Sequence, residues 1–207
     1  ISELPKDIDG IIFTLGSDGQ GRIGARAIDY GGVRNILRIF RDAPIHIALM
    51  TTIGVTERLS TWNQRTEVHD WKRRAERLVR VSGHPYTIVR PGWFDYNNDD
   101  EHRIVMLQGD RRHAGTPEDG VISREQIAQV LVSALTNDEA KNKTFELVAK
   151  RGEAQQDLTP LFADLQTDNS QKNDGVLDID NMPLREEPEC IINELNLYSK
   201  KITNLQL

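Results

Sequence analysis

Short apolar runs alternate with longer amphipathic segments along most of the chain. The clearest runs, each bounded by glycine, proline or polar residues, are Ile11–Leu15, Ile45–Met50, Tyr86–Val89 and Thr144–Ala149. They are rich in β-branched and aromatic residues, which favour strands, and their nearly continuous apolar character is typical of parallel strands covered on both faces. The alternation therefore predicts an α/β fold with a doubly wound parallel sheet and right-handed crossovers.

Helix signals lie between these runs. Residues 25–40 show a helical period, and Ser123 followed by Gln126 forms a capping box at the start of a later helix. In the segment after Glu67, apolar residues fall on one helical face: Trp71, Ala75, Leu78 and Val79. Gly83 suits the left-handed position that closes a helix, and Pro85 prevents its continuation.

The last part of the chain has a different character. Gln166–Glu189 is polar, acidic and interrupted by glycine and proline, which predicts a loop or linker. Beyond it, apolar residues recur at steps of three and four: Ile191, Leu195, Tyr198, Ile202 and Leu205. This pattern predicts a helix that docks on its own domain or contacts a partner. We therefore expect one domain over residues 1–165 and an appendage over residues 166–207.

Composition excludes several classes of protein. The net charge of −6 argues against a general nucleic-acid binder, which needs a basic face. The one basic cluster, Lys72–Arg74 with Arg77 and Arg80, is interpreted as a solvated helix face. Cys190 is the single cysteine, and the histidines show no metal-ligand spacing, so we expect no metal site and a reducing, cytoplasmic location. No apolar stretch approaches the ~20 residues that span a bilayer.

Residues 67–94 carry a more specific pattern. Lys72 is followed by Glu76 four residues later, then by Ser82-Gly83 and by the sequence TIVRPG at residues 87–92. This pattern resembles the later half of the short-chain dehydrogenase/reductase superfamily, in its atypical, NmrA-like branch. The resemblance extends roughly from Ile8 to Leu165. It implies a Rossmann-like fold and NAD(P) as the cofactor.

The resemblance also implies a site at the carboxyl ends of the strands, where open α/β sheets bind ligands. Lys72 is expected to contact the nicotinamide ribose, and the hydroxyl of Thr52 to orient a substrate. The residues expected around the cofactor are Leu15, Gly16, Ser17, Thr51, Lys72, Pro91, Gly92, Trp93 and Phe94.

Val68 occupies the position of the superfamily's catalytic tyrosine, and its aliphatic side chain cannot transfer a proton. General acid–base catalysis contributes typically ~10²–10⁴-fold, so ordinary carbonyl reduction should be weak. Tyr30, Asp29 and His69 are weak candidates for a replacement. Two classes remain: a cofactor-binding sensor or weak oxidoreductase, and an active NAD(P)-dependent oxidoreductase or epimerase with an unorthodox acid–base residue.

The superfamily's glycine-rich phosphate loop is absent upstream of Ile11, so we expect a preceding segment that contains it. Gly19–Gly24 matches GxGxxG, but it starts four residues after Leu15, and no acidic residue ends the next strand. We interpret it as a glycine-rich loop beside the cofactor, with a true phosphate loop as the alternative. Without a neighbouring strand, Ile11–Leu15 would form an exposed edge through which two copies could pair.

Overall fold

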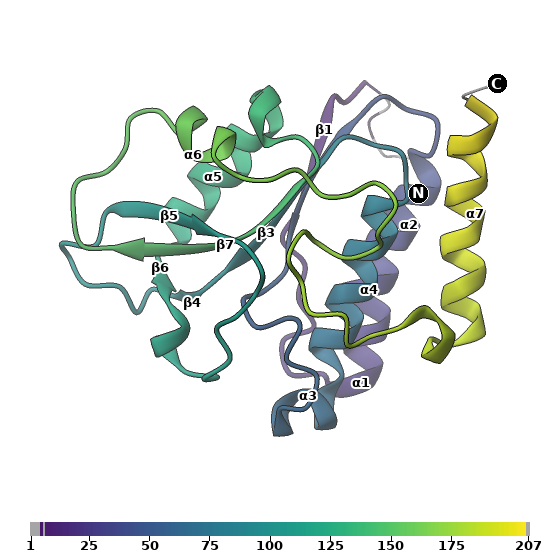
Figure 1. Ribbon diagram of the computed structural model, residues 1–207, viewed down its shortest axis with the longest axis horizontal. Helices are drawn as coiled ribbons and strands as arrows, with labels where there is room; N and C mark the ends of the chain where they lie inside the picture. The colour runs from purple at the N-terminus through teal and green to yellow at the C-terminus, as the bar shows by residue number, and fades with distance from the viewer. Residues whose placement is uncertain (1–4, 6, 206–207) are drawn as a thin grey trace.

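A seven-stranded, mostly parallel sheet forms the centre of the computed structural model, which describes residue 5 and residues 7–205 (Figure 1). Its strands are β1 Gly10–Phe13, β2 His46–Met50, β3 Tyr86–Pro91, β4 Trp93–Phe94, β5 Arg103–Leu107, β6 Val121–Ile122 and β7 Lys143–Lys150. Their order is β1-β2-β3-β7-β6-β4, and β5 also pairs with β7. The four predicted strands are confirmed, and they pair in parallel. The sheet is nevertheless mixed, because β5 and β6 run antiparallel to β7.

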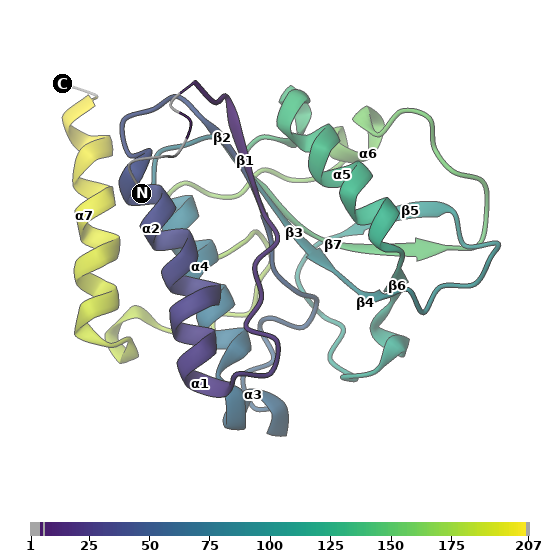
Figure 2. The ribbon, with the colours of Figure 1, turned by 180° about the vertical axis from the view of Figure 1, so that it is seen from behind.

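Helices cover both faces of the sheet, as predicted. The α-helices are α1 Gly21–Gly24, α2 Gly31–Ile39, α3 Thr61–Thr66, α4 Val68–Arg80, α5 Arg124–Thr136, α6 Thr159–Ala163 and α7 Glu189–Leu205. A π-helical segment, η1 Ala25–Tyr30, joins α1 to α2, and three short 3₁₀ turns are η2 Pro117–Asp119, η3 Asp138–Ala140 and η4 Leu184–Glu186. Figures 1 and 2 show α2, α4 and α7 on one face and α5 and α6 on the other. A separate hydrophobic cluster lies under each layer.

Several local predictions are confirmed. Ser123 caps α5 in a complete capping box with Gln126, and Gly83 has a φ of +82° after the end of α4. The first helical segment begins at Gly21 rather than at residue 25. The elements α1, η1 and α2 follow one another without a break. The first strand ends at Phe13, where its pairing with Leu49 of β2 stops.

The apolar face of α4 is buried as predicted, but the interpretation of its basic face is wrong. Arg73 and Arg77 are 0% and 1% exposed, and Arg74 is also buried. Residues 166–188, which we call the acidic segment, cross over this face and neutralise it. Asp174 lies 3.0 Å from Nε of Arg73 and 2.7 Å from Nη2 of Arg77, and Glu187 lies 2.6 Å from Nε of Arg74.

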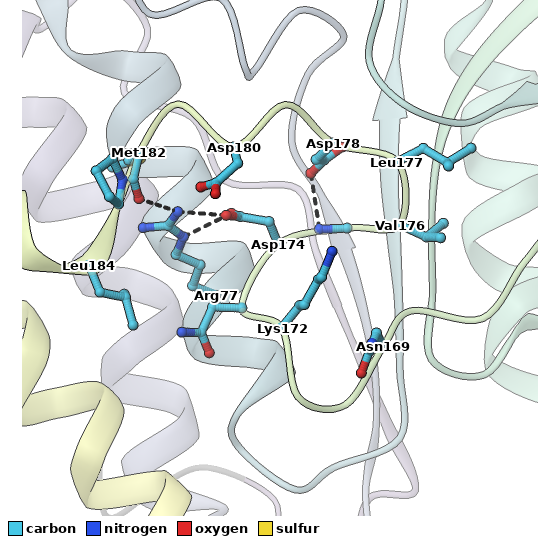
Figure 3. A pocket seen from close by; sticks show the side chains of 13 residues that line it. Arg77, Asn169, Lys172, Asp174, Val176, Leu177, Asp178, Asp180, Met182 and Leu184 are labelled. Atoms are coloured by element: carbon cyan, nitrogen blue, oxygen red, sulfur yellow. Dashed lines mark hydrogen bonds and ion pairs between the residues drawn. The ribbon is translucent and has the colours of Figure 1, made fainter.

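Backbone carbonyls complete these arginine contacts. In Figure 3, the guanidinium of Arg77 points at Asp174 and at the carbonyl of Met182, to which it donates at 2.6 Å. Arg73 donates to the carbonyl of Ile179 at 2.7 Å. The segment also surrounds a hollow of about 450 Å³ next to Arg77. The acidic segment is mainly a loop, as predicted. It packs against α4 and does not merely connect the sheet domain to the final helix.

The final helix docks on its own domain, in agreement with the first of the two alternatives. Ile191, Leu195 and Tyr198 are buried in the cluster that also contains residues of α2 and α4. Glu194 accepts a hydrogen bond from the hydroxyl of Tyr30 and lies 3.0 Å from Nη2 of Arg38. The side chains of Ile202 and Leu205, which belong to the same predicted face, lie outside the described residues.

The buried position of Arg77 generates a stability prediction. Replacement of Arg77 with Met should lower the free energy of unfolding by about 3 kcal/mol or more, because Asp174 and Glu187 lose a buried partner. The matched control is Arg151→Met, since Arg151 pairs with Asp100 in an exposed position and should change stability little. Urea unfolding checks both variants. Equal, small effects would show that the acidic segment does not bury Arg77.

Candidate functional site

The loops after β1, β2 and β3 meet at one edge of the sheet. Because these three strands are parallel and adjacent, their carboxyl ends point the same way. In Figures 1 and 2 this edge lies at the end of the molecule where α1 and α3 also lie. The loops carry the site residues expected at strand ends, and α4 supplies Lys72. This edge is therefore the candidate site.

Lys72 is fixed by a buried carboxylate. Its Nζ lies 2.7 Å from Oδ1 of Asp29, whose side chain is fully buried, while the Lys72 side chain is 12% exposed. Asp29 lies in η1, and π-helical turns within α-helices occur frequently at functional sites. One turn before Lys72, Val68 packs against the hydrophobic cluster on this face of the sheet. Asp29 thus positions the ammonium group.

Thr51 and Thr52 have different surroundings. The hydroxyl of Thr51 is buried and donates to Oε1 of Glu76 at 2.7 Å. Thr52 is partly exposed, and its hydroxyl donates to the carbonyl of Ile53 at 3.2 Å. Only Thr52 presents a hydroxyl that a substrate can reach without breaking a buried contact.

The loop after β1 combines exposed and buried positions. Leu15 is 41% exposed and Gly16 is also exposed, whereas Ser17 is buried. Gly19 and Gly21 have φ angles of +76° and +63°. A Cβ on Gly24 would lie 2.3 Å from Cβ of Gln20 and 3.2 Å from Cβ of Ser17. The backbone conformation or the local packing therefore favours glycine at each glycine position of the GxGxxG match. The interpretation of this segment as a glycine-rich loop beside the cofactor stays a prediction.

The short strand β4, which follows β3 after Gly92, carries two aromatic side chains, Trp93 and Phe94. Pro91 and Gly92 are buried, and a Cβ on Gly92 would lie 2.4 Å from the carbonyl oxygen of Gly120. Trp93 is 37% exposed and contacts Tyr96 edge to face, with ring centroids 6.1 Å apart. Phe94 lies under the guanidinium of Arg124, 5.3 Å from it.

Residues 109–116, which sequence reasoning missed, complete the site; we call them the clamp loop. Asp110 accepts hydrogen bonds from the backbone N–H groups of Gly54 and Thr56, both at 2.7 Å. Burial opposes ionisation, but the nearby His113, the charge of Arg90 and the hydrogen bond from Thr56 lower the pKa of Asp110 to about 2. A lone aspartate in a polar loop carries no sequence signal for this contact across more than fifty residues.

Glu146 of β7 is a buried carboxylate with little compensation. It is 3% exposed, and Nη1 of Arg90 lies 3.6 Å from its Oε1, too far for a hydrogen bond. Arg90 instead forms close ion pairs with Glu76 and Asp178, both at 2.7 Å. Because the charge of Arg90 is shared with these two carboxylates, it stabilises the ionised form of Glu146 only weakly. Burial therefore has the larger effect and raises the pKa of Glu146 to about 8.

The three candidates for a replacement base have structural roles. The hydroxyl of Tyr30 faces Glu194, and burial raises its pKa. Asp29 is paired with Lys72. His69 places Nδ1 3.2 Å from the carbonyl of Glu57, and burial lowers its pKa. Among them, only His69 lies next to the loop that follows β2.

We also searched the part of the chain that the structure describes for a metal site and for a membrane-spanning helix. No cluster of three or more His, Cys, Asp or Glu side chains is arranged to hold a metal ion. None of the described helices is both long enough and apolar enough to cross a membrane.

Comparison with known proteins identifies the family. A sequence profile described as NAD(P)H-binding matches residues 1–138. The chain belongs to this NAD(P)H-binding family. Its fold agrees: a putative NAD-dependent epimerase/dehydratase from Bacillus halodurans superposes with a TM-score of 0.61 at 21% identity, over 77% of this chain and 71% of that one. The Rossmann-like fold and the cofactor NAD(P) are thus confirmed, as predicted.

One similar protein is a sanguinarine reductase from Eschscholzia californica. It is 37% identical over 68% of this chain and 53% of that protein. An uncharacterized sugar epimerase from Bacillus subtilis is 28% identical over 71% of this chain and 66% of its own length. The chain therefore spans between about half and two thirds of the length of these relatives.

The residues of this NAD(P)H-binding protein fit one part of the cofactor. The ammonium of Lys72, the hydroxyl of Thr52 and the exposed surfaces of Leu15, Gly16 and Trp93 suit a ribose and an adjoining ring. Thr51 and Ser17 are buried and are therefore less accessible to a ligand. When bound, the cofactor supplies a hydride or accepts one. The outer edge of β1 has no partner strand among the described residues.

Lys72→Ala should weaken NAD(P) binding by about 1.5–3 kcal/mol, the typical contribution of a hydrogen bond to a charged group. Lys141→Ala is the control, because Lys141 pairs with the exposed Asp138 away from this edge. Titration calorimetry measures both affinities. An unchanged affinity in Lys72→Ala would remove Lys72 from the cofactor site.

Glu146→Gln should stabilise the protein increasingly as the pH rises from 5 to 8. A carboxyl whose pKa is raised on folding contributes stability below its unfolded pKa, and this contribution is lost as the pH climbs to about 8. Glutamine carries no such penalty, so the difference between variant and wild type should grow by about 1–3 kcal/mol. Urea unfolding at several pH values measures it, with exposed Glu139→Gln as the control. A difference that does not change with pH would show that Glu146 ionises normally.

Proposed function

We propose that this protein is an NAD(P)H-dependent oxidoreductase of the reductase type, in which Lys72 holds the nicotinamide ribose and Thr52 orients the substrate. The observation that carries this proposal is the ion pair between Lys72 and the buried Asp29. It fixes one ammonium group at the edge where the strand ends meet. A solvated lysine on a helix surface would not need a buried carboxylate partner.

The named relatives support hydride chemistry. One is a reductase and another an uncharacterized sugar epimerase, so the family includes proteins named for redox and epimerisation activities. The side chains after β3 offer an apolar wall, since Trp93 and Tyr96 are 37% and 63% exposed. Aromatic faces of this kind suit a flat organic substrate.

The second candidate function is an NmrA-like sensor that binds NAD(P) without turnover. Val68 favours it, because its side chain is packed into the hydrophobic cluster and offers no proton. A sensor also needs a partner surface. Ile191, Leu195 and Tyr198 of α7 are buried against the protein itself, whereas Leu197 is exposed and could contact a partner.

We also infer an aqueous, reducing compartment, and we propose the cytoplasm. The single cysteine, Cys190, is free and exposed. Relatives such as a TIC 62 protein of Oryza sativa are named as chloroplastic. Cell fractionation that separates cytosol from plastids tests this location.

Turnover distinguishes the two functions. The reductase proposal predicts NAD(P)H oxidation with at least one member of a panel of quinones, aldehydes and ketones, at rates well below those of tyrosine-containing relatives. Val68→Tyr should increase the rate because it restores a proton donor one helical turn before Lys72. Tight NAD(P)H binding with no oxidation of the cofactor on the whole panel, in both proteins, would favour the sensor.

A further inference from the structure

The clamp loop brings a histidine and two carboxylates to the edge that carries the proposed reductase site. His113 places Nε2 3.2 Å from the hydroxyl oxygen of Thr56 and 3.8 Å from Oδ2 of Asp110. Its Nδ1 lies 3.4 Å from Oε2 of Glu57. The side chain of Asp110 is fully buried, whereas those of His113 and Glu57 are 20% and 31% exposed.

This cluster is continuous with the site on two sides. Toward β2, Gly54 and Thr56 donate backbone hydrogen bonds to Asp110, and they follow Thr52 directly in the chain. Toward α4, the carbonyl of Glu57 contacts His69, which lies one turn before Lys72.

A third connection reaches the loop after β3. Arg112, the neighbour of His113, donates to the carbonyl of Asp119 at 2.9 Å. The next residue, Gly120, accepts a hydrogen bond from the backbone of Trp93 at 2.9 Å. The clamp loop, which carries His113, is therefore connected with both segments that are expected to line the substrate.

The two ring nitrogens differ in a way that suits proton transfer. Nε2 faces the interior, where Thr56 and the ionised Asp110 hold the ring in place. Nδ1 faces the partly exposed carboxylate of Glu57, and the distance between them is longer than that of a normal hydrogen bond. An oriented histidine that is partly exposed and has a carboxylate near each ring nitrogen can act as a general acid or base.

We propose that His113, positioned by Asp110, gives its Nδ1 proton to the oxygen of a reduced carbonyl substrate, in place of the tyrosine that Val68 replaces. This inference rests on the proposed reductase function. When the carbonyl carbon gains a hydride, the C=O π pair moves to oxygen, which then takes the proton from His113 and becomes a hydroxyl. The neutral imidazole regains a proton from solvent.

Electrostatics supports the charged form of the ring before the reaction. The interaction with the carboxylate of Asp110, followed by the charge of Glu57, raises the pKa of His113 above its ordinary value. Arg90 lies near Asp110, and His69 is the other titratable side chain of this neighbourhood; the pKa of His69 is lowered by burial. The pKa values of the two histidines are therefore shifted in opposite directions, and His113 is the one whose protonated form is favoured.

The experiment compares two hydride acceptors in His113→Asn. The first, 4-nitrobenzaldehyde, needs a proton after hydride transfer, whereas an N-alkylquinolinium cation becomes neutral without one. The variant should lose at least 10²-fold in kcat/KM with the aldehyde and less than twofold with the cation. The wild-type aldehyde profile should fall at high pH as His113 loses its proton, and the variant should lack this limb. His102→Asn, at an exposed histidine, should match the wild type.

A second measurement needs no substrate. Two-dimensional NMR of the histidine rings should show that His113 titrates above the ordinary value, and that Glu57→Gln lowers this pKa while the protein stays folded. An ordinary pKa for His113, or parallel losses with both acceptors in His113→Asn, would overturn its role as proton donor. Failure of the wild type to reduce either acceptor would contradict the reductase function and, with it, this role.

Discussion

The whole helical layer depends on the neutralisation of buried arginines. Arg90 at the end of β3 is 0% exposed and is held by Glu76 of α4 and by Asp178 of the acidic segment. An arginine charge without partners at such a position would be strongly destabilising, because desolvation of a charge costs several kcal/mol. The acidic segment therefore supplies the carboxylates that allow α4 to pack on the sheet.

This network also reaches the candidate site. Glu76, which pairs with Arg90, accepts the hydrogen bond from Thr51 at the end of β2. The clamp loop then fixes the turn that follows Thr52 through Asp110. The candidate site is thus supported by buried ion pairs and by the clamp loop, which comes after β5. Such support holds functional side chains in one geometry before any ligand binds.

The sequence predicted what depends on local patterns. Apolar runs located β1, β2, β3 and β7, and the Ser123–Gln126 pair located the start of α5. It could not predict contacts between distant charged residues. The helix face that carries Arg77 has the composition of a solvated face. Arg77 is nevertheless a core residue, because it pairs with Asp174, far along the chain. Asp110 and His113 were missed for the same reason. The positions of Lys72 and Thr52 came from the resemblance to a family, since periodicity alone gives no chemistry.

We propose that NAD(P) binds at the carboxyl edge formed by the loops after β1, β2 and β3. Amide hydrogen exchange with and without NADP⁺ tests this location, because exchange reports local protection along the whole backbone. We expect NADP⁺ to slow exchange at residues 14–17, 51–57 and 91–96 and in the clamp loop, and to leave α5 and the acidic segment unchanged. Protection confined to the acidic segment around Arg77, or to α7, would contradict it.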